Sequence, residues 1–558
     1  MVDSTLASEP RSGALSSSDT ERVSSPDLLV FRDDRRIVSG ARQKSALLSA
    51  IHALSNTPST DEIITPLLLA GEMECGVADT GGNSIHPWQT VTDQLAEALV
   101  MGGAIHRERL CAVLAQSAVP DQMEISTAEG FAYYALHPMA FAEVWKLLGA
   151  LPQQLIVIGI RSIGTTLSAV TAAAARKHGT SAVRTTVRPG GHPYNRRASF
   201  SPDQLELIED GLRRNAGLLI VDEGPGLSGS SFLSVAEALV RAGVPAANIV
   251  LVCSHQPDLD GLCAEDAPRR ARCFRWVAAP AMPSVQAHGA KFIGGGEWRR
   301  RLIPDETLWP AAWISFERPK YLVEHGNGNK TLLKFLGLGP YGEQVRVREE
   351  QLAIAKFAPL PRQEAGGFAS YPCIAGRPLG HADLSRAVIE RLARYCAFRV
   401  SAFAAPLDNL RALEFMGRHN ALKLGADCDI RLCLERPVIA DGKMHPYEWL
   451  TTGDGEMLKT DSGIHGDDHF FPGVTDIAWD LAGVMIEWRM SPEQRRIFLE
   501  TYEKLSGDAP AARINGFLRA YAAFRAAWSV MAAHALRGTD EQRRFERESI
   551  QYRAACSG

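Results

Sequence analysis

The sequence offers little that would indicate secretion, a membrane or a zinc cluster. Its ten cysteines include no CxxC pair, so the sequence predicts neither a structural zinc site nor a disulfide framework. No hydrophobic run reaches about 18 residues, and no basic stretch followed by an apolar one stands at the N-terminus. We therefore expect a cytoplasmic protein that is neither exported nor bound to a membrane.

A strong net charge is also absent. Lys and Arg total 60 and Asp and Glu total 64, which leaves a formal net charge of −4. This balance gives no global electrostatic reason to expect nucleic acid as a partner. The 558 residues, of which 46% are hydrophobic, are enough for about two to four globular domains.

Changes in composition divide the chain into four parts. Residues 1–40 are rich in Ser, Asp, Arg and Pro and predict a disordered tail, because they can bury too little apolar surface to offset the entropy of ordering. Residues 41–150 show helical patterns and are expected to form a helical extension that packs on a sheet domain. Residues 151–300 alternate strand and helix patterns, which predicts an α/β fold with a parallel sheet and helices on both faces. Residues 315–545 are expected to form a separate half.

Residues 218–232 combine a buried strand, two acids and a loop of small residues that opens a helix. The apolar run 218–221 is long enough for a central parallel strand. Asp222 and Glu223 follow it, where they can accept from ribose hydroxyls or coordinate them through Mg²⁺. The small residues leave backbone N–H groups uncovered beside the start of a helix over 232–242, which favours a bound phosphate. The residues predicted to hold this phosphate are Gly224, Gly226, Ser228, Gly229, Ser230 and Ser231.

Two further segments carry groups that suit a diphosphate. Residues 157–170 have the strand, turn and helix pattern again, with Arg161, Ser162 and Gly164 around the turn. The planar guanidinium of Arg161 suits bidentate recognition of oxygen atoms. Residues 184–200 are basic, and their candidate ligands are Arg184, Arg188, His192, Tyr194, Arg196 and Arg197. The alternative interpretation of this basic segment is a solvated hairpin.

The run 218–232 resembles the phosphoribosyl-diphosphate signature of type I phosphoribosyltransferases, and 157–170 resembles the diphosphate loop of that family. The resemblance implies a phosphoribosyl-diphosphate substrate, Mg²⁺ as a cofactor, and an acceptor that the sequence does not identify. It places Asp222 and Glu223 on the ribose-binding acids and Ser230 on the 5′-phosphate. It also implies that residues 184–200, with Arg188 and His192, form a basic hood over the leaving group, so that these two and Arg161 join the acids as catalytic candidates.

The match to that signature has two departures. Leu227 and Ser228 stand where the family more often has Thr followed by Gly, and Pro225 stiffens a loop that is usually supple. An ordinary strand-to-helix turn of an α/β domain remains the alternative interpretation, because glycine-rich turns alone are common.

The second half, from about residue 315, resembles the aminoglycoside phosphotransferase and choline kinase branch of the protein-kinase-like fold. Residues 320–335 predict a hairpin with a Gly-Asn-Gly-Asn turn, which places Lys334 as the phosphate-pairing strand lysine. Residues 343–357 predict the helix that supplies an acidic partner, Glu349 or Glu350. Residues 370–380 resemble the hinge strand and the following Gly-Arg-Pro-Leu turn. The resemblance implies a nucleoside triphosphate such as ATP as a ligand.

The expected catalytic stretch of this half is 440–461. The resemblance places His445 in the nucleotide site and Asp461 as a metal-binding acid, with Glu448 replacing the usual metal-binding Asn. Lys443 occupies the position of the catalytic Asp, and a charged lysine cannot accept a proton. Asp441 is the substitute base that we consider. The alternative for the whole half is a helical domain that covers the first active site.

Residues 465–483 resemble the later segment that braces the catalytic loop, with Asp476 and Asp480 in that role. Within it, His465, Asp467, Asp468 and His469 have a composition like that of a metal site, and the alternative interpretation is a polar loop that caps a helix.

Three functional hypotheses follow. The first is a phosphoribosyltransferase-type enzyme coupled to a kinase-like nucleotide-binding domain, which makes or modifies a nucleotide-like small molecule. The second is a non-catalytic nucleotide-sensing regulator. The third is a small-molecule kinase whose phosphoribosyl fold presents the substrate. Neither the oligomeric state nor the acceptor can be predicted from the sequence.

Overall fold

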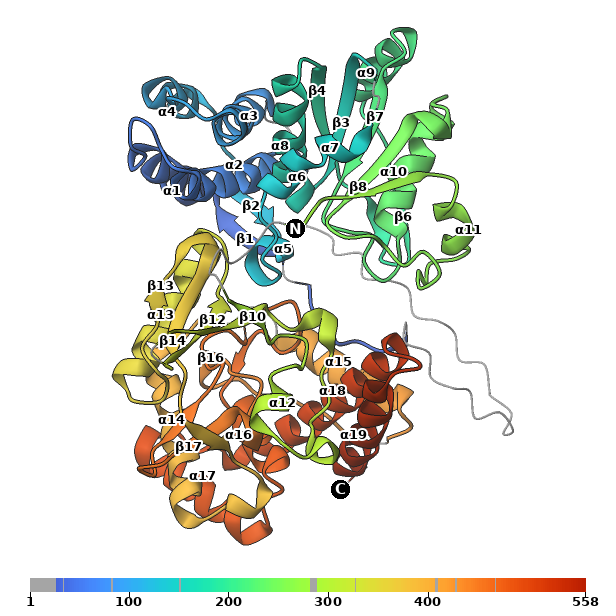
Figure 1. The fold of residues 1–558 in the computed structure, drawn as a ribbon. Coiled ribbons are helices and arrows are strands. Elements are labelled where there is room, and N and C mark those ends of the chain that lie inside the picture. Colours follow the sequence, from blue (N-terminus) through green and yellow to red (C-terminus); the bar gives the residue numbers. More distant parts are fainter. Residues whose placement is uncertain are drawn as a thin grey trace, which may run out of the picture.

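The chain forms two halves of different architecture, which lie one above the other in Figure 1. The computed structural model describes residues 27–557, except 34, 82–83, 150–151, 282–288, 327, 407–409, 427–428 and 467. The first half contains a parallel sheet and the second contains an antiparallel sheet and most of the long helices. Within the described residues, no helix is both long enough and apolar enough to span a bilayer.

A parallel sheet of five strands forms the centre of the first half, as the alternating pattern of 151–300 predicts. The strand order is β4-β3-β7-β8-β9. The strands are β3 (Gln154–Ile160), β4 (Ser181–Val187), β7 (Gly217–Val221), β8 (Ile249–Cys253) and β9 (Arg275–Ala278). The helices between them are α8 (Ile163–Lys177), α9 (Pro202–Arg213), α10 (Ser230–Arg241) and α11 (Ala267–Ala271).

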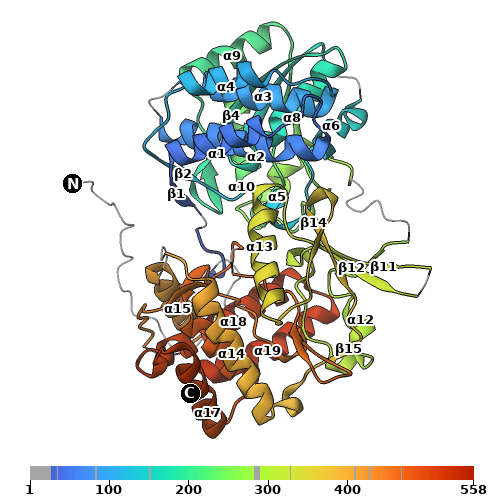
Figure 2. The same cartoon turned by 90° about the vertical axis from the view of Figure 1, so that its left-hand side faces the viewer.

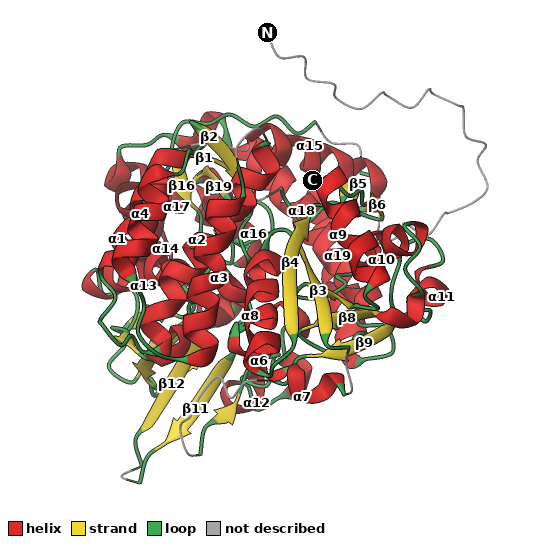
Figure 3. Ribbon diagram, turned by 90° about the horizontal axis from the view of Figure 1, so that it is seen from above, coloured by secondary structure: helices red, strands yellow, loops and turns green. Residues whose placement is uncertain are grey.

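Alternating side chains of the central strands enter two different cores. Leu155 and Val157 of β3 pack in the core that contains α8, whereas Ile156 and Ile158 pack in the core that contains α9 and α10. Successive side chains of a strand point to opposite faces of its sheet. The near-continuous apolar run of β3 is therefore explained by helices on both faces, which Figure 3 shows from above.

The predicted helical extension packs on the α8 side of the sheet. Its long helices α2 and α3 contact α8, and a short antiparallel pair, β1 with β2, closes it. Its elements are β1 (Arg36–Ser39), α1 (Gly40–His52), α2 (Thr60–Thr80), α3 (His86–Met101), α4 (Arg107–Gln116), β2 (Gln122–Ile125), α5 (Glu129–Tyr133), α6 (Met139–Glu143) and α7 (Trp145–Leu148).

The second half is built on a five-stranded sheet of order β10-β11-β12-β14-β13. Its strands are β10 (Lys291–Phe292), β11 (Lys320–Glu324), β12 (Lys330–Phe335), β13 (Arg362–Gln363) and β14 (Phe368–Pro372). Helix α13 (Pro340–Ile354) connects β12 to β13. The predicted hairpin is present, because β11 and β12 pair antiparallel across the turn at 325–329.

Helices and small sheets complete this half. The helices are α12 (Arg299–Leu302), α14 (Arg386–Ala402), α15 (Leu410–Lys423), α16 (Ala478–Glu487), α17 (Pro492–Ser506), α18 (Ile514–Ala535) and α19 (Asp540–Ser557). The strands are β15 (Gly376–Pro378), β16 (Pro437–Ile439), β17 (Trp449–Thr452), β18 (Met457–Lys459) and β19 (Val474–Asp476). A large core of buried aliphatic and aromatic side chains joins α14, α16 and α18.

The two halves share a core and are joined through α5 and α13. Phe335 and Leu338 of the second half belong to the hydrophobic core of the first. The amide of Leu338 donates to the carbonyl of Phe131 at 2.9 Å. The Tyr341 hydroxyl accepts from the amide of Ala128 at 3.3 Å and donates to Glu72. Figure 2 shows α5 and α13 where the halves meet.

The predicted boundaries need three corrections. Of the predicted tail, residues 1–26 and 34 lie outside the described residues, but disorder is wrong for 28–39. Leu28 and Val30 are buried in the core of the second half, because their apolar side chains find partners there that are distant in sequence. The second half also begins earlier than 315, since β10 pairs with β11, and its last helix continues to Ser557, beyond residue 545.

Candidate functional sites

The loop after β7 lies at the carboxyl edge of the parallel sheet, as the sequence predicts. Gly229 has a φ of +73°, which glycine adopts without strain, and stands directly before α10. The first amides of a helix have no partner within it. Here the amide of Ser230 donates to the Ser228 hydroxyl at 3.2 Å and that of Gly229 to the Pro225 carbonyl at 2.9 Å, and Ser231 lies in the first turn of α10.

The hydroxyls of this loop are already bound to the hood. Ser228 donates to the Pro193 carbonyl at 2.9 Å, and Ser230 donates to the same oxygen. Pro193 connects the two short strands of the hood, β5 (Gly190–His192) and β6 (Asn195–Arg197). The hood therefore places a carbonyl oxygen where the sequence predicts a phosphate oxygen, and it would have to move before these hydroxyls could bind a ligand.

The two predicted ribose-binding acids are half-buried and held by backbone amides. Glu223 accepts from the amide of Gly130 on α5 at 2.9 Å, and Asp222 accepts from the amide of Glu223 at 2.9 Å. Burial raises the pKa of Asp222 to about 8 and the pKa of Glu223 to about 7. Near neutral pH each of these carboxyls is therefore close to its own pKa. The Glu223 side chain points toward α5.

The arginines predicted to grip a diphosphate converge on one carboxylate. Arg161 pairs with Asp79 of α2 at 2.8 Å, and Arg188 pairs with the same side chain. Gly164 has no room for a Cβ, which would lie 2.5 Å from the carbonyl of Val221. Gly164 therefore allows α8 to pack closely on β7. The guanidinium groups of Arg161 and Arg188, which were predicted to bind diphosphate, are instead paired with Asp79.

Four other predicted positions lie at the margin of this site. Gly224 faces His255, whose ring a Cβ would approach to 3.0 Å, and Gly226 is open, with a φ of +58°. His192 is exposed on β5, where its Nδ1 accepts from the amide of Tyr194 at 3.3 Å. Ser162 precedes α8 without capping it through its side chain.

Arg184 is not part of the hood, contrary to the sequence prediction. Its guanidinium is buried on β4 and bonds both oxygens of Glu74, at 2.7 and 2.9 Å. It also bonds Asp93 at 2.7 Å. The prediction was wrong because the sequence pattern does not distinguish an arginine in a buried ion pair from a solvated arginine.

Replacing Arg184 by Met is expected to lower the free energy of unfolding by about 3–5 kcal/mol, because Glu74 is left buried without its partner. Urea unfolding followed by circular dichroism measures this effect. Arg213→Met is the matched control, since that side chain is 66% exposed and should change stability by less than about 0.5 kcal/mol. Equal losses in the two variants would contradict the buried pairing.

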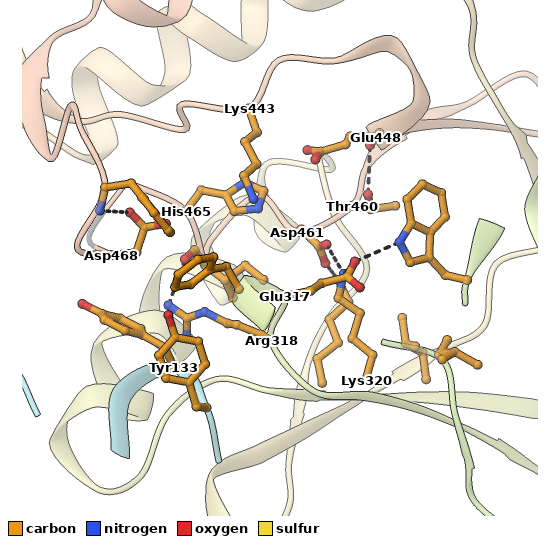
Figure 4. Close-up of a pocket in the computed structure, with 18 of the residues that line it drawn as sticks. Tyr133, Glu317, Arg318, Lys320, Lys443, Glu448, Thr460, Asp461, His465 and Asp468 are labelled. Carbon is orange, nitrogen blue, oxygen red and sulfur yellow. Dashed lines mark hydrogen bonds and ion pairs between the residues drawn. The ribbon is translucent and has the colours of Figure 1, made fainter. Parts of the chain in front are cut away.

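The second half contains a cavity of about 170 Å³ between its sheet and the loops after β16 and β18, shown in Figure 4. Its polar wall contains the predicted residues Lys334, Glu448 and Asp461 together with Lys443. The further charged and polar groups on the wall are Glu317, Arg318, Lys320, Thr460, His465, Asp468 and His469, of which the sequence pointed only to the two histidines and Asp468, as part of a metal-like group.

Asp461 lies between two buried lysines. Lys320 and Lys334 are directly opposite each other on β11 and β12, and their ammonium groups approach Asp461 at 2.7 and 2.6 Å. Opposed like charges destabilise a strand pair, and Asp461 offsets their repulsion. Burial works in the opposite direction, but the two lysines hold the pKa of Asp461 well below its ordinary value. Asp461 has a φ of +45°, which is strained for a residue with a side chain.

Lys320 is a partner that the sequence analysis missed. The hairpin register, together with the prediction of Lys334, would have placed the first residue of β11 on the same face. Glu349, a predicted acidic partner of Lys334, is buried on α13 and accepts from the amide of Gly463 at 2.9 Å, whereas the ion pair of Lys334 is with Asp461. Burial raises its pKa against the charge of Lys334. Glu349 therefore positions the backbone just after Asp461.

The loop that carries Lys443 brings three more groups together. Asp441, Glu448 and His465 each offer one possible metal-ligand atom, and these three atoms lie within 4.8 Å of one another. Lys459 already approaches Glu448 at 2.5 Å and Asp441 at 3.6 Å. Because its ammonium neutralises these two acids, we do not assign a metal to this trio. Burial opposes the ionised form of Glu448, but Lys459 above all keeps its pKa below the ordinary value.

His465 lies between an acid and a cation. Its Nδ1 is 3.3 Å from the Oδ1 of Asp441, and Lys443 reaches toward its ring in Figure 4. Burial and the charge of Lys443 lower the pKa of His465, although Asp441 and Glu448 act in the opposite direction. The imidazole is therefore neutral at neutral pH and has one nitrogen available as a proton acceptor.

His445 does not belong to the cavity wall, contrary to its predicted place in a nucleotide site. Its Nδ1 lies 2.9 Å from Glu487, and its ring stacks on Tyr447. His445, Glu487 and Tyr521 form a buried polar group between the loop after β16 and α18. His445 therefore packs against Glu487 and Tyr447, although its position in the sequence matches the family pattern.

The four residues with the composition of a metal site do not converge in the described part of the chain. Asp467 lies outside the described residues. His465 faces Asp441, Asp468 accepts from the amide of Phe470, and His469 enters an aromatic cluster. Of the two predicted bracing acids, Asp480 accepts from the amide of Asp441 at 2.8 Å, as predicted, whereas Asp476 accepts from the amides of Glu435 and Arg436, before that loop.

No protein-family model and no curated protein matches the chain. Solved structures similar to it include a choline kinase from Streptococcus pneumoniae, with 13% identity over 42% of this chain and 90% of that chain and a TM-score of 0.30. An ethanolamine kinase from Plasmodium vivax has 12% identity over 43% and 79%, with a TM-score of 0.29. A spectinomycin phosphotransferase, APH(9)-Ia, in complex with ADP and spectinomycin has 16% identity over 48% and 89%, with a TM-score of 0.31. At such low identities and scores, the function of this chain has to be argued from its own residues.

Proposed function

We propose that the cavity of the second half binds an Mg²⁺–nucleoside triphosphate and that the protein is a small-molecule phosphotransferase. The pairing of Asp461 with Lys320 and Lys334 carries this proposal. A magnesium nucleotide supplies a cation for the carboxylate and phosphate oxygens for the ammonium groups. It can therefore replace the internal pairing without leaving a buried charge uncompensated.

The carboxylates of the cavity fit Mg²⁺ by their donor chemistry. Asp461 and Glu448 both line the cavity and offer hard oxygen ligands, which this ion prefers. Asp461 would hold the ion, with Lys320 and Lys334 turned to phosphate, and Glu448 would join it through the carboxylate oxygen that Lys459 does not bond. When bound, Mg²⁺ would neutralise charge on the phosphate oxygens.

His465 is the general base that we propose for the transfer. In this step an acceptor hydroxyl forms a bond to the terminal phosphorus, while the bond from that phosphorus to the leaving nucleoside diphosphate breaks. The hydroxyl proton passes to the free ring nitrogen of His465, and Asp441 stabilises the resulting cation through Nδ1. The ammonium of Lys443 cannot accept that proton, and its charge would stabilise the transferring phosphoryl oxygens.

Replacing Lys334 by Met tests nucleotide binding. The variant is expected to bind Mg²⁺–ATP about 10- to 100-fold more weakly by calorimetry, because a hydrogen bond to a charged group contributes about 1.5–3 kcal/mol. Lys320 still pairs with Asp461, so folding should survive. Lys330→Met is the control on the same strand, since its side chain is 45% exposed. The proposed function is contradicted if the unaltered protein does not bind Mg²⁺–ATP, or if the Lys334→Met and Lys330→Met variants bind it with equal affinity.

A second candidate function belongs to the first half. The observation that favours it is the position of Asp222 and Glu223 at the carboxyl end of β7, beside the first amides of α10. We propose that this edge binds a ribosyl 5′-phosphate, with Ser230 on the phosphate once the hood releases it. Arg161 and Arg188 would then exchange Asp79 for diphosphate oxygens.

A further inference from the structure

The wall of the cavity opposite its lysines is aromatic and comes from both halves of the chain. Tyr133 and Tyr134 reach it from α5 and the residue after it, and Phe316, His469 and Phe470 complete it. The His469 ring centroid lies 4.1 Å from that of Phe470 and 5.6 Å from that of Phe316. The tyrosine rings lie at 5.8 and 6.3 Å from it. These rings pack on one another at interplanar angles between 37° and 61° and form an aromatic cluster on this side of the cavity.

His469 is the unusual member of this wall. The residue is 4% exposed, and neither ring nitrogen has a hydrogen-bond partner among the described residues. The nearest charge is the Glu129 carboxylate, 3.7 Å from Nδ1. Neighbouring side chains cover both nitrogens, and the ring stacks on Phe31. An unpaired buried polar group costs free energy, so a ligand toward which this ring turns and to which it bonds would recover that cost. Burial lowers the pKa of His469 to about 4, which leaves the neutral ring with one donor and one acceptor.

We propose that this wall is the acceptor subsite and that it binds a planar, ring-bearing compound with a polar edge, of the nucleoside class. The ring of the acceptor lies against Tyr134 and Phe316, and its polar edge bonds to His469. Stacking of this kind contributes about 0.5–1.5 kcal/mol per aromatic pair. This inference rests on the proposed function, because the acceptor hydroxyl must reach the phosphates held near Lys320 and Asp461.

A cationic acceptor fits this wall poorly. The face of Tyr133 is already covered by the Arg318 guanidinium, 5.0 Å from the ring centroid. Arg318 is held there by the carbonyls of Leu336 and Ile464, at 2.8 and 3.0 Å. A second cation would meet this charge and that of Lys443 without a free aromatic face on Tyr133. A neutral planar ring is not repelled by these charges and does not need a free face on Tyr133.

The test is equilibrium binding to the full chain. Adenosine, uridine, ribose 5-phosphate and choline are each titrated by calorimetry in the presence of Mg²⁺ and a non-hydrolysable ATP analogue, which fills the nucleotide site. We expect at least one nucleoside to bind and the other two probes to bind at least about 10-fold more weakly. His469→Phe keeps the stacking surface but removes both polar atoms, and should weaken nucleoside binding at least about 10-fold. His106→Phe, at an exposed histidine, is the control.

The outcomes separate this inference from the function on which it rests. Binding of the ATP analogue without any nucleoside, tighter binding of choline, or equal nucleoside affinity in the His469→Phe and His106→Phe proteins would overturn the acceptor subsite alone. Failure of the ATP analogue to bind overturns the proposed function. In that case the nucleosides are titrated without the analogue, and the same comparison of variants decides the subsite. Equal thermal midpoints of the two variants exclude unfolding as the cause.

Discussion

Replacing His465 by Asn is expected to lower the rate of phosphoryl transfer by on the order of 10²–10⁴-fold, the usual contribution of a positioned general base. Asparagine can keep a hydrogen bond to Asp441 but cannot accept the proton. Binding of Mg²⁺–ATP should change little, because Lys320, Lys334 and Asp461 are untouched. The rate is measured as ADP release in the presence of nucleosides, and the affinity by calorimetry.

His325→Asn is the control for this experiment. His325 is exposed at the start of the turn between β11 and β12 and does not line the cavity. An unchanged rate in His465→Asn would rule out the imidazole as the base. If the unaltered protein binds Mg²⁺–ATP and nucleosides but releases no ADP, the nucleotide-sensing hypothesis replaces the kinase hypothesis. Lys443, which stands where the kinase-like pattern has its catalytic Asp, would then explain the missing activity.

Joint replacement of Asp222 by Asn and Glu223 by Gln is expected to lower any release of diphosphate by on the order of 10²-fold, by analogy with the loss of one electrostatic contact to a transition state. The two carboxylates are proposed to hold the ribose on which positive charge develops. The assay follows diphosphate release from phosphoribosyl diphosphate with a panel of nucleobases. Glu206→Gln with Glu209→Gln, two exposed positions on α9, is the matched double control.

Loss of activity in this variant can be separated from unfolding. The pKa of each acid is higher in the folded protein than in the unfolded chain. Their stabilising contribution is thus complete below the unfolded pKa values and is lost as the pH rises through about 7 to 8. At pH 6 both carboxyls are mostly protonated, and amides resemble them. A turnover equal to that of the control pair would remove the ribosyl-phosphate activity.

Helix α5 connects the two candidate sites physically. The amide of Gly130 at its start donates to Glu223, and Tyr133 at its end lines the cavity of the second half. The carbonyl of Phe131 between them accepts from Leu338. One short helix therefore contacts both candidate sites.

Much of the local structure could be predicted from the sequence. The strand, loop and helix around Asp222 were predicted correctly, because an apolar run followed by small residues has few alternatives. The hairpin that carries Lys334 was predicted from its turn, and Asp461 was identified as a metal-binding acid by the resemblance of one stretch to a family pattern. Each of these features depends on neighbours within about 20 residues, where pattern and turn chemistry act.

The partners of these residues could not be predicted in the same way. Asp79 lies 82 residues before Arg161, with which it pairs, and the Pro193 carbonyl reaches Ser228 across 35 residues. His445 matched a family pattern and is nevertheless bound to Glu487. Composition does not distinguish an arginine that awaits a ligand from one that is already paired.

The sequence by itself determined the alternation of strands and helices in the first half, the parallel sheet, the absence of a long apolar span and the small-residue character of the two loops predicted to bind phosphate. Only the tertiary structure decided which charges are paired, which histidine is left without a partner, and that tyrosines of the first half line the cavity of the second. The physical reason is that periodicity and turn chemistry act along the chain, whereas pairing and burial depend on residues brought together from far apart in it.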